Sequence, residues 1–202
     1  MFKHETQVIK FLLQWYSMNA RKLPWRKKNN LNLPHPYFVF VSEYMLQQTT
    51  VNTVKNKFNE FILKWPSLNK LAQTSEPNIL EFWSGLGYYS RARNLLKSAK
   101  IIKNNFKNKI PETYDELIQL PGIGDYTAKA ILGIGYNKSV MPLDANIERI
   151  LVRLHAIDKP INKVKNKLKD LGKKFISDKY SSNLIQSFMD YGSEICLPRN
   201  PK

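Results

Sequence analysis

Apolar residues recur at three-to-four-residue spacing along nearly the whole chain, and this period limits the fold more than any other feature. The first such stretch has Val8, Phe11, Leu12, Trp15 and Tyr16 on one face. The period returns in residues 51–65, 91–106, 128–135, 145–156, 164–176 and 183–195. No stretch of the sequence alternates as a half-buried strand does. The sequence therefore predicts an all-α fold of packed helices with short loops.

Composition narrows the class of protein further. With 202 residues, 43% of them hydrophobic, the chain can bury a core in one unit or in two small lobes that share a cleft. A single cysteine excludes an internal disulfide framework. No apolar run approaches the roughly 20 residues of a membrane span, and the amino terminus is not a secretory signal. We expect a soluble intracellular protein that makes no membrane contact.

The chain is strongly basic, with 32 Lys and Arg against 16 Asp and Glu and a net charge of +16. An excess of this size attracts polyanions, of which nucleic acid is the default candidate. A general lysine bias is the alternative, because the chain is also rich in Asn and Ile. Charge proposes a partner without identifying it.

The segment LPGIGDYTA, residues 120–128, places two glycines between two helical stretches. Pro121 ends the first helix, and Gly122 and Gly124 permit backbone angles that other residues resist. The resulting turn would point its amides outward, together with the free N–H groups of the next helix, and could bind a phosphate. An ordinary helix–helix connection is the alternative.

Two carboxylates stand out, Glu43 because of its surroundings and Asp144 because of its position after the hairpin. Glu43 lies in FVFVSEYMLQQTT, among apolar residues that should raise its pKa and keep it protonated near neutrality. The alternative is a solvent-facing residue in the first turn of a helix capped by Ser42. The hairpin resembles the helix-hairpin-helix of the DNA glycosylase superfamily that includes endonuclease III, and this resemblance implies an acid shortly after it, which here is Asp144 in MPLDANIERIL. Asp144 precedes a helical stretch, so the alternative is an N-cap with no chemical role.

As a pair, the two acids match one chemical need. Breaking an N-glycosidic bond requires a proton donor to the leaving base and a negative charge beside the developing oxocarbenium ion. Glu43 would supply the proton, and Asp144 would remain ionised.

Several blocks of the sequence resemble known DNA glycosylases. The hairpin is similar to the helix-hairpin-helix of the superfamily that includes endonuclease III. The chain as a whole resembles the MutY-type adenine DNA glycosylases, which remove adenine mispaired with 8-oxoguanine or guanine. The blocks are SEYMLQQT (42–49), WSGLGYYSRARNL (83–95), DANIERILVR (144–153), RKLPWR (21–26) and MDYGSEIC (189–196).

The resemblance implies two helical lobes within a catalytic domain of residues 1–202. One lobe would comprise about residues 1–28 and 159–202. The other would comprise about 29–158, with the helix-hairpin-helix at 114–135. It also implies a monomer that acts on double-stranded DNA with a flipped adenine. If the source is bacterial, the protein would be cytoplasmic and associated with the nucleoid.

The resemblance also assigns roles to the chemical groups. Glu43 would protonate adenine at N7, Asp144 would stabilise or trap the oxocarbenium ion, and Asn146 would position the sugar or the water. Tyr126 occupies the position of the Schiff-base lysine of endonuclease III. Since a phenol cannot form that imine, we expect hydrolysis without efficient strand nicking.

Further positions would contact the DNA. Gln48 and Tyr88 would wedge into the base stack, although core packing is the alternative for Tyr88. The adenine pocket would be lined by Leu23, Trp25, Arg26 and Gln186, with Leu46 and Thr49 close by. Gly122 and Gly124 would hold phosphate, and Arg91, Arg93, Lys129 and Lys138 are further phosphate contacts or merely solvated cations.

The family's iron–sulfur motif is incomplete here. Members hold a [4Fe–4S] cluster with four cysteines spaced C-x6-C-x2-C-x5-C, and Cys196 matches the first of them. One thiolate cannot hold such a cluster, so we expect none to be bound by this chain. The chain is either incomplete, as its stop at the cluster boundary favours, or a variant without the cluster. A monovalent cation at the hairpin remains an expectation, and the chemistry needs no cofactor.

The family's 8-oxoguanine-recognition domain has no counterpart in these residues, so weaker opposite-base discrimination is expected. Three alternatives stand beside an adenine glycosylase. An endonuclease III-like lyase is disfavoured by Glu43 and Tyr126. A thymine-mismatch glycosylase shares that tyrosine, but Glu43 within MLQQT favours adenine. A non-catalytic hairpin module would be expected to lack Glu43 or Asp144, and both are present.

Overall fold

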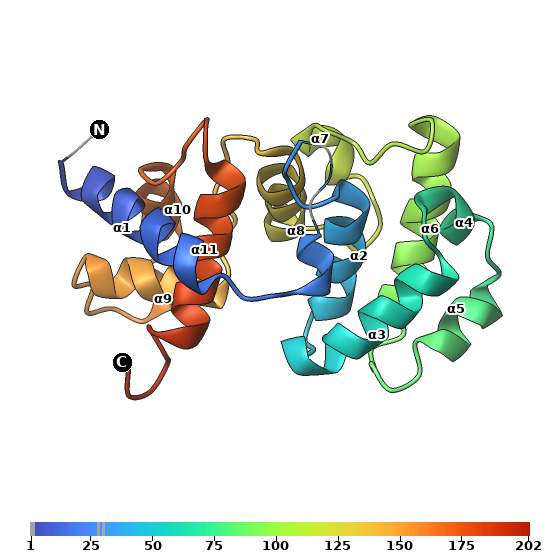
Figure 1. Ribbon diagram of the computed structural model, residues 1–202, viewed down its shortest axis with the longest axis horizontal. Helices are drawn as coiled ribbons and strands as arrows, with labels where there is room; N and C mark the ends of the chain where they lie inside the picture. The colour runs from blue at the N-terminus through green and yellow to red at the C-terminus, as the bar shows by residue number, and fades with distance from the viewer. Residues whose placement is uncertain (1–2, 28, 30) are drawn as a thin grey trace.

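The computed structural model describes residues 3–27, 29 and 31–202. Within these residues the chain is helical with connecting turns and contains no β-strand, which confirms the predicted all-α class. No helix among the described residues has the length and apolarity that crossing a bilayer requires. The helical elements form two groups, on the left and right of Figure 1.

The terminal lobe, named for the two chain ends that it contains, comprises α1 (Lys3–Asn19), α9 (Ala145–Leu154), η3 (Ile161–Lys163), α10 (Lys165–Lys173) and α11 (Ser181–Glu194). The central lobe comprises η1 (Pro24–Arg26), α2 (Pro36–Leu46), α3 (Val51–Lys64), α4 (Leu68–Ala72), α5 (Glu76–Phe82), α6 (Ser90–Asn105), α7 (Tyr114–Leu117), α8 (Asp125–Ala130) and η2 (Ile131–Gly135). Helix α11 packs against α1 and α9, while α6 packs against α2, α4 and α5.

The lobe boundaries differ from those expected from the sequence. Helix α9 packs against α10 and α11, so the chain returns to the terminal lobe before Ala145 rather than after residue 158. The short η1 packs against α2 and α3, so the first crossing also comes a few residues earlier. The physical reason is that α9 has a strongly one-sided apolar face, including Ile147 and Leu151, which the terminal lobe buries.

Side-chain hydroxyls begin several of the helices. Thr50, Ser67, Ser75 and Thr113 each accept a hydrogen bond from the amide three residues later. At Thr113 the hydroxyl also donates to Glu116 Oε2 at 2.6 Å. Thr113 thus supplies the hydroxyl half of a capping box, while the Glu116 carboxylate binds that hydroxyl.

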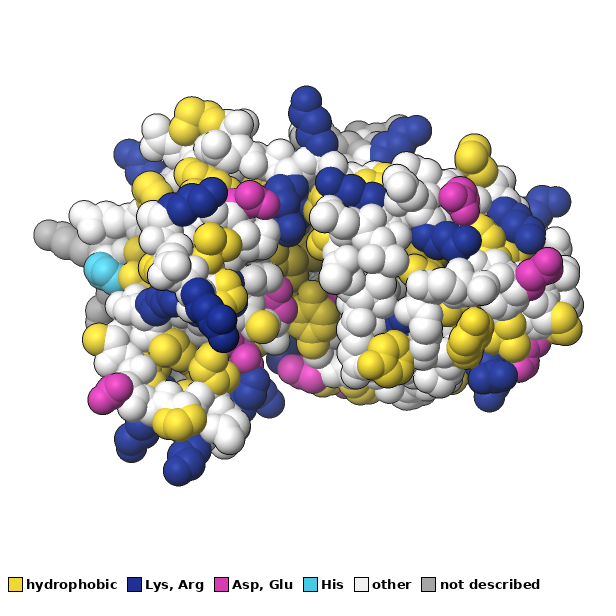
Figure 2. All heavy atoms as spheres, turned by 90° about the horizontal axis from the view of Figure 1, so that it is seen from below, with side chains coloured by type: hydrophobic (Ala, Val, Ile, Leu, Met, Phe, Trp, Pro, Cys, Tyr) yellow, Lys and Arg dark blue, Asp and Glu magenta, His cyan; other side chains and the backbone are white. Residues whose placement is uncertain are grey.

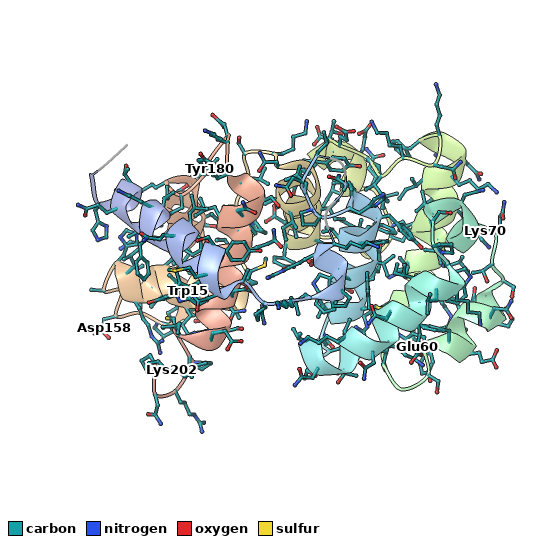
Figure 3. All side chains as sticks on the ribbon, in the orientation of Figure 1. Trp15, Glu60, Lys70, Asp158, Tyr180 and Lys202 are labelled. Carbon is teal, nitrogen blue, oxygen red and sulfur yellow. The ribbon has the colours of Figure 1, made fainter. Side chains whose placement is uncertain are left out.

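The lobes are joined by close packing and by a buried ion cluster. The π-helical η2 contacts both α2 and α11, and Gly133 leaves no room for a side chain beside Ile185 of α11. Asp190, fully buried on α11, pairs with Arg21 Nε and Arg26 Nη1, both at 2.6 Å. Side chains from both lobes extend into the space between them in Figure 3.

Candidate active site

A cavity of about 560 Å³ lies between the two lobes. Seen from below in Figure 2, the molecule is hollowed between the lobes, with apolar and acidic side chains in the hollow and Lys and Arg side chains around it. The predicted site residues that line the cavity are Leu23, Trp25, Arg26, Glu43, Leu46, Gln48, Thr49, Tyr126, Asp144, Asn146 and Gln186. The structure therefore brings most of the predicted site together.

Glu43 enters this cavity from the interior of α2. The helix is capped by His35, and Ser42 donates to the carbonyl of Val39 at 2.9 Å, so the alternative of an exposed first-turn residue is wrong. The side chain is only 7% exposed. Burial, assisted by the nearby Asp144 carboxyl, raises the pKa of Glu43 to about 8, while a hydrogen bond from Tyr126 acts in the opposite direction.

Asp144 enters from the other lobe as the N-cap of α9. Its Oδ1 accepts from the amide of Ile147 at 2.8 Å, and its Oδ2 accepts from Asn146 Nδ2 at 2.9 Å. Burial raises the pKa of Asp144, and these hydrogen bonds, with the Arg149 guanidinium, act in the opposite direction. Capping and a place in the cavity are therefore compatible for this residue.

A second layer of contacts holds Asn146 in place. Arg149 Nη2 donates to Asn146 Oδ1 at 2.8 Å and also to the Gly192 carbonyl. A Cβ on Gly192 would lie 2.5 Å from Asn146 Cβ, so α11 approaches this side chain as closely as a glycine allows. Arg149 and Gly192 lie within the segments that resemble the family, but nothing in the sequence predicted a role for either residue.

Tyr126 lies on α8, beside both carboxyls. Its hydroxyl is hydrogen-bonded to Glu43, and burial together with the two acids raises its pKa well above the usual value. It is therefore a neutral phenol at physiological pH. It offers the site a hydrogen bond and no amine.

The two hairpin glycines serve different purposes. Gly122 has φ of +81°, and a Cβ there would lie 3.0 Å from both Asn94 Cβ and Tyr44 Cε1. Gly124 has φ of −101°, which any residue adopts, and a Cβ there would meet no atom within 4 Å. The expectation that both glycines are needed for backbone angles is thus wrong for Gly124, whose bare backbone instead faces open space.

The Asp125 carboxylate, just after the hairpin turn, is held by two neighbouring side chains. Its Oδ1 accepts from the Tyr114 hydroxyl at 3.0 Å and pairs with Lys129 Nζ at 2.8 Å. Although partial burial opposes it, these two bonds hold the pKa of Asp125 below its usual value. A carboxylate at this position is unfavourable for phosphate binding because both groups are negative. Lys129, one turn later on the helix, offsets the charge of Asp125.

The two predicted wedge residues lie on neighbouring loops. Gln48 is exposed in the loop between α2 and α3, and Tyr88 is 61% exposed in the loop between α5 and α6. Core packing is therefore excluded for Tyr88. Both residues have positive φ, +57° and +47°, in the left-handed region that non-glycine residues seldom occupy.

The predicted cations separate into two groups. Arg91 is only 5% exposed and donates to backbone carbonyls, so the prediction of a direct phosphate contact is wrong for this residue. Arg91 lies in the first turn of α6, and its guanidinium points into the lobe toward the carbonyls at the end of α2. Arg93 is exposed and pairs with Glu76 at 2.8 Å, and Lys138 lies 4.0 Å from Glu112. These two stay predictions.

The predicted base pocket is apolar on one side and polar on the other. Leu23 and Trp25 are buried, and the Arg26 guanidinium is held by Asp190 through two bonds of 2.6 and 2.7 Å. Buried Gln186 donates from Nε2 to the Ser182 carbonyl at 3.0 Å. Its Oε1 has no hydrogen-bond partner among the described atoms, which leaves one acceptor for a ligand.

Metal and cluster ligands are scarce around the site. Cys196 is the only cysteine of the chain, and its Sγ lies 3.1 Å from Arg153 Nη1. The described residues contain no group of three or more His, Cys, Asp or Glu placed to hold a metal ion. The residues present therefore do not fit a four-thiolate cluster. At the hairpin, the Pro121 carbonyl is engaged by Tyr44 and Ser98, and the Gly122 carbonyl by Gln47.

Comparisons with known proteins identify the family. The family model described as HhH-GPD superfamily base excision DNA repair protein matches residues 41–174. The adenine DNA glycosylase of Buchnera aphidicola subsp. Baizongia pistaciae is 44% identical over 95% of this chain and 53% of its own length. The adenine DNA glycosylase of Homo sapiens is 36% identical over 100% of this chain and 38% of its own length. The chain thus spans about half, or less, of these two relatives.

Solved structures show the same fold. A thermostable thymine-DNA glycosylase matches with a TM-score of 0.85 at 23% identity, over 99% of this chain and 91% of its own. A trapped endonuclease III–DNA covalent intermediate matches with a TM-score of 0.78 at 18% identity, over 100% of this chain and 92% of its own. At these identities the likeness concerns the fold alone.

Proposed function

We propose, because the chain belongs to the HhH-GPD superfamily of base excision DNA repair proteins, that it carries the catalytic part of an adenine DNA glycosylase. Its reaction would be hydrolysis of the N-glycosidic bond of adenine mispaired with 8-oxoguanine or guanine. Relatives that bear the name adenine DNA glycosylase support the choice of base.

The observation that carries the proposal is the convergence of two carboxyls from different lobes on one cavity. Glu43 comes from the interior of α2 and Asp144 from the N-terminus of α9. Because burial raises the pKa of Glu43 to about 8, this carboxyl is protonated at neutral pH and can act as an acid. Asp144 is supplied with donors that favour its charged form.

The chemistry can be followed group by group. As the bond between C1′ and N9 breaks, its electron pair passes into the purine, and the Glu43 proton moves to N7 of the leaving base. The Asp144 carboxylate stabilises the positive charge that develops on the sugar. Water then adds to C1′ and gives up a proton to the Glu43 carboxylate, which restores the acid, and the products are free adenine and an abasic site.

Strand cleavage would not accompany this reaction. A lyase needs an amine at the sugar carbon to form an imine, and Tyr126 offers a phenol next to Glu43. The protein would thus be a monofunctional glycosylase whose product is cut only when alkali is added.

A base in a duplex must be extruded before it can reach a cavity between two lobes. Gln48 and Tyr88, both exposed on loops of the central lobe, would occupy the space that the base leaves. The open backbone at Gly124 would receive a phosphate, and the net charge of +16 would attract the duplex. We propose a monomer acting on chromosomal DNA, at the nucleoid if the source is bacterial. A monovalent cation bound by the hairpin carbonyls is part of the same proposal.

Single-turnover excision tests the proposal directly. A duplex with adenine opposite 8-oxoguanine is incubated with the parent protein and with Glu43→Gln, and each sample is analysed with and without alkali. We expect strand scission that depends on alkali for the parent and none for the variant. Scission without alkali would contradict the monofunctional chemistry, and an active Glu43→Gln would refute the assigned acid. A duplex of otherwise identical sequence with thymine opposite guanine tests the thymine-mismatch alternative, which predicts removal of thymine from it.

A further inference from the structure

We propose that Arg91 is a positioning residue that holds the loops carrying Gln48 and Tyr88 as one unit, and so controls extrusion of the target nucleotide. The inference rests on the proposed function, since extrusion has meaning only for an enzyme that acts on a base in a duplex. Arg91 itself lies inside the central lobe and touches neither carboxyl of the cavity.

The first half of the contact set is the end of α2. Arg91 Nη1 donates to the Met45 carbonyl at 2.8 Å, to the Tyr44 carbonyl at 3.2 Å and to the Gln47 carbonyl. Tyr44 and Met45 lie in the last turn of the helix, and Gln47 is its C-cap, directly before Gln48. The guanidinium therefore satisfies a helix C-terminus that would otherwise lack partners.

The second half is the loop between α5 and α6. Arg91 Nη2 donates to the Leu86 carbonyl at 2.8 Å and to the Gly87 carbonyl at 3.1 Å, the two residues directly before Tyr88. The same nitrogen donates back across to Thr49 Oγ1 at 3.0 Å. One planar group thus bridges two loops that are about 40 residues apart in the sequence.

The backbone of both loops explains why such a bridge is needed. Gln48 and Tyr88 each have positive φ, a conformation that persists in non-glycine residues only when the surroundings fix it. In each case the carbonyls fixed by Arg91 come from the residues just before the unfavourable one. The guanidinium also lies 5.6 Å from the Tyr88 ring centroid. We therefore infer that both wedge side chains owe their direction to this residue.

Lysine could not replace arginine in this role. The ammonium group is a single point with three donors, whereas the guanidinium presents a planar fork that reaches acceptors on two sides. Arg91→Lys keeps the charge and most of the apolar stem while removing the bridge. It is therefore a sharper test than truncation to alanine.

The test compares two substrates of Arg91→Lys in single turnover. One duplex carries adenine opposite 8-oxoguanine, and the other carries adenine opposite an abasic-site analogue, where no base pair has to be broken. We expect the rate on the paired adenine to fall on the order of 10- to 100-fold. We expect the rate on the unpaired adenine to fall less than about threefold. Replacing the target by 2-aminopurine gives a second readout, a smaller rise in fluorescence on binding.

Lys100→Gln is the control, because it removes an exposed cation from the same helix and should leave both rates unchanged. If Arg91→Lys does not fold, Thr49→Val replaces it. This change removes the hydroxyl that accepts from Arg91 Nη2 and that donates to the Gln47 and Leu86 carbonyls, one in each of the two loops. Thr49→Val should also slow the paired substrate more than the unpaired one. Equal losses on the two substrates, or no loss on either, would overturn the proposal. Failure of the proposed function is distinct, because the parent would then excise adenine from neither duplex.

Discussion

Glu43 and Asp144 are chemically similar groups placed in dissimilar surroundings. Glu43 sits in the middle of a helix whose neighbouring residues are buried and apolar, and it receives one hydrogen bond from a side chain, that of Tyr126. Asp144 sits at the start of a helix, where a backbone amide and Asn146 both donate to it. Position within a helix thus decides whether a buried carboxyl finds donors.

The difference assigns the roles. A carboxyl with few donors holds its proton, and burial raises the pKa of Glu43 to about 8. A carboxyl at a helix N-terminus gains from backbone amides and the helix dipole, which favour its charged form. Burial nevertheless raises the pKa of Asp144, so its negative charge depends on the hydrogen bonds from Ile147 and Asn146. Mutations that exchange or remove these donors test the division of roles.

The largest effect is expected for Glu43→Gln. The amide retains size and polarity but cannot give up a proton, so the single-turnover excision rate should fall by about 10³-fold. Binding to a duplex, measured by fluorescence anisotropy, should change little, because the side chain is almost fully buried. A loss of less than tenfold would show that another group protonates the base.

Asp144→Asn should have the next largest effect. Asparagine is as good an N-cap as aspartate, so the free energy of unfolding should change by less than about 1 kcal/mol. The lost charge should lower the excision rate on the order of 10²-fold. Asp144→Ala provides the contrast, since it also loses the cap and should cost about 1 kcal/mol more in urea unfolding. Equal rates for Asp144→Asn and the parent would assign this residue to capping alone.

Glu43 should also make stability depend on pH, because the free energy of unfolding should fall as the pH rises. Its folded pKa is about 8 against the unperturbed 4.5, so between these values the unfolded chain has released a proton that the folded chain retains. Raising the pH therefore favours unfolding. The parent should lose up to about 1.4 kcal/mol per pH unit relative to Glu43→Gln across this window. The check is to measure the free energy of unfolding of both proteins from pH 5 to 8. The same dependence on pH in the two proteins would contradict the raised pKa.

The sequence predicted the fold class and the contents of the cavity better than it predicted individual contacts. Helical periodicity was enough for an all-α fold, and the apolar residues around Glu43 were enough to expect a protonated acid. Asp144, Asn146 and Tyr126 came from the resemblance, and the structure brings them to the same cavity. These features depend on local patterns or on motifs that occupy consecutive positions.

Contacts between distant segments were not predictable in this way. The direction of the Arg91 side chain depends on carbonyls in two other loops, so a basic motif alone suggested phosphate instead. The boundary near Ala145 depends on which lobe buries the apolar face of α9. Asp190, which holds Arg21 and Arg26, gave no signal in the sequence because its partners lie some 165 residues away.

A smaller effect is expected at the second layer around Asp144. In Gly192→Ala the new Cβ would lie 2.5 Å from Asn146 Cβ, so we expect Asn146 to shift and to disturb its hydrogen bond to Asp144 Oδ2. We expect a loss in excision rate of about tenfold. Gly172→Ala is the matched control in the same lobe, because its Cβ would come no closer than 3.2 Å to another atom, the Cδ2 at the end of the Leu143 side chain. A Gly192→Ala protein as active as this control would show that Asn146 does not position Asp144.

The smallest effect is expected for Tyr126→Phe, which changes the one side-chain donor of Glu43. The hydrogen bond from Tyr126 favours the charged carboxylate, so its removal should raise the pKa of Glu43 further. The alkaline limb of the rate profile, where the acid loses its proton, should then move to higher pH. At neutral pH the acid is already protonated in the parent, so the rate should change by less than about threefold. Glu43→Gln/Tyr126→Phe, compared with Glu43→Gln, is the control, since a phenol that acts only through Glu43 has no effect once that acid is gone. An alkaline limb that stays in place or moves to lower pH would show that Tyr126 contributes through the sugar or the base rather than through Glu43.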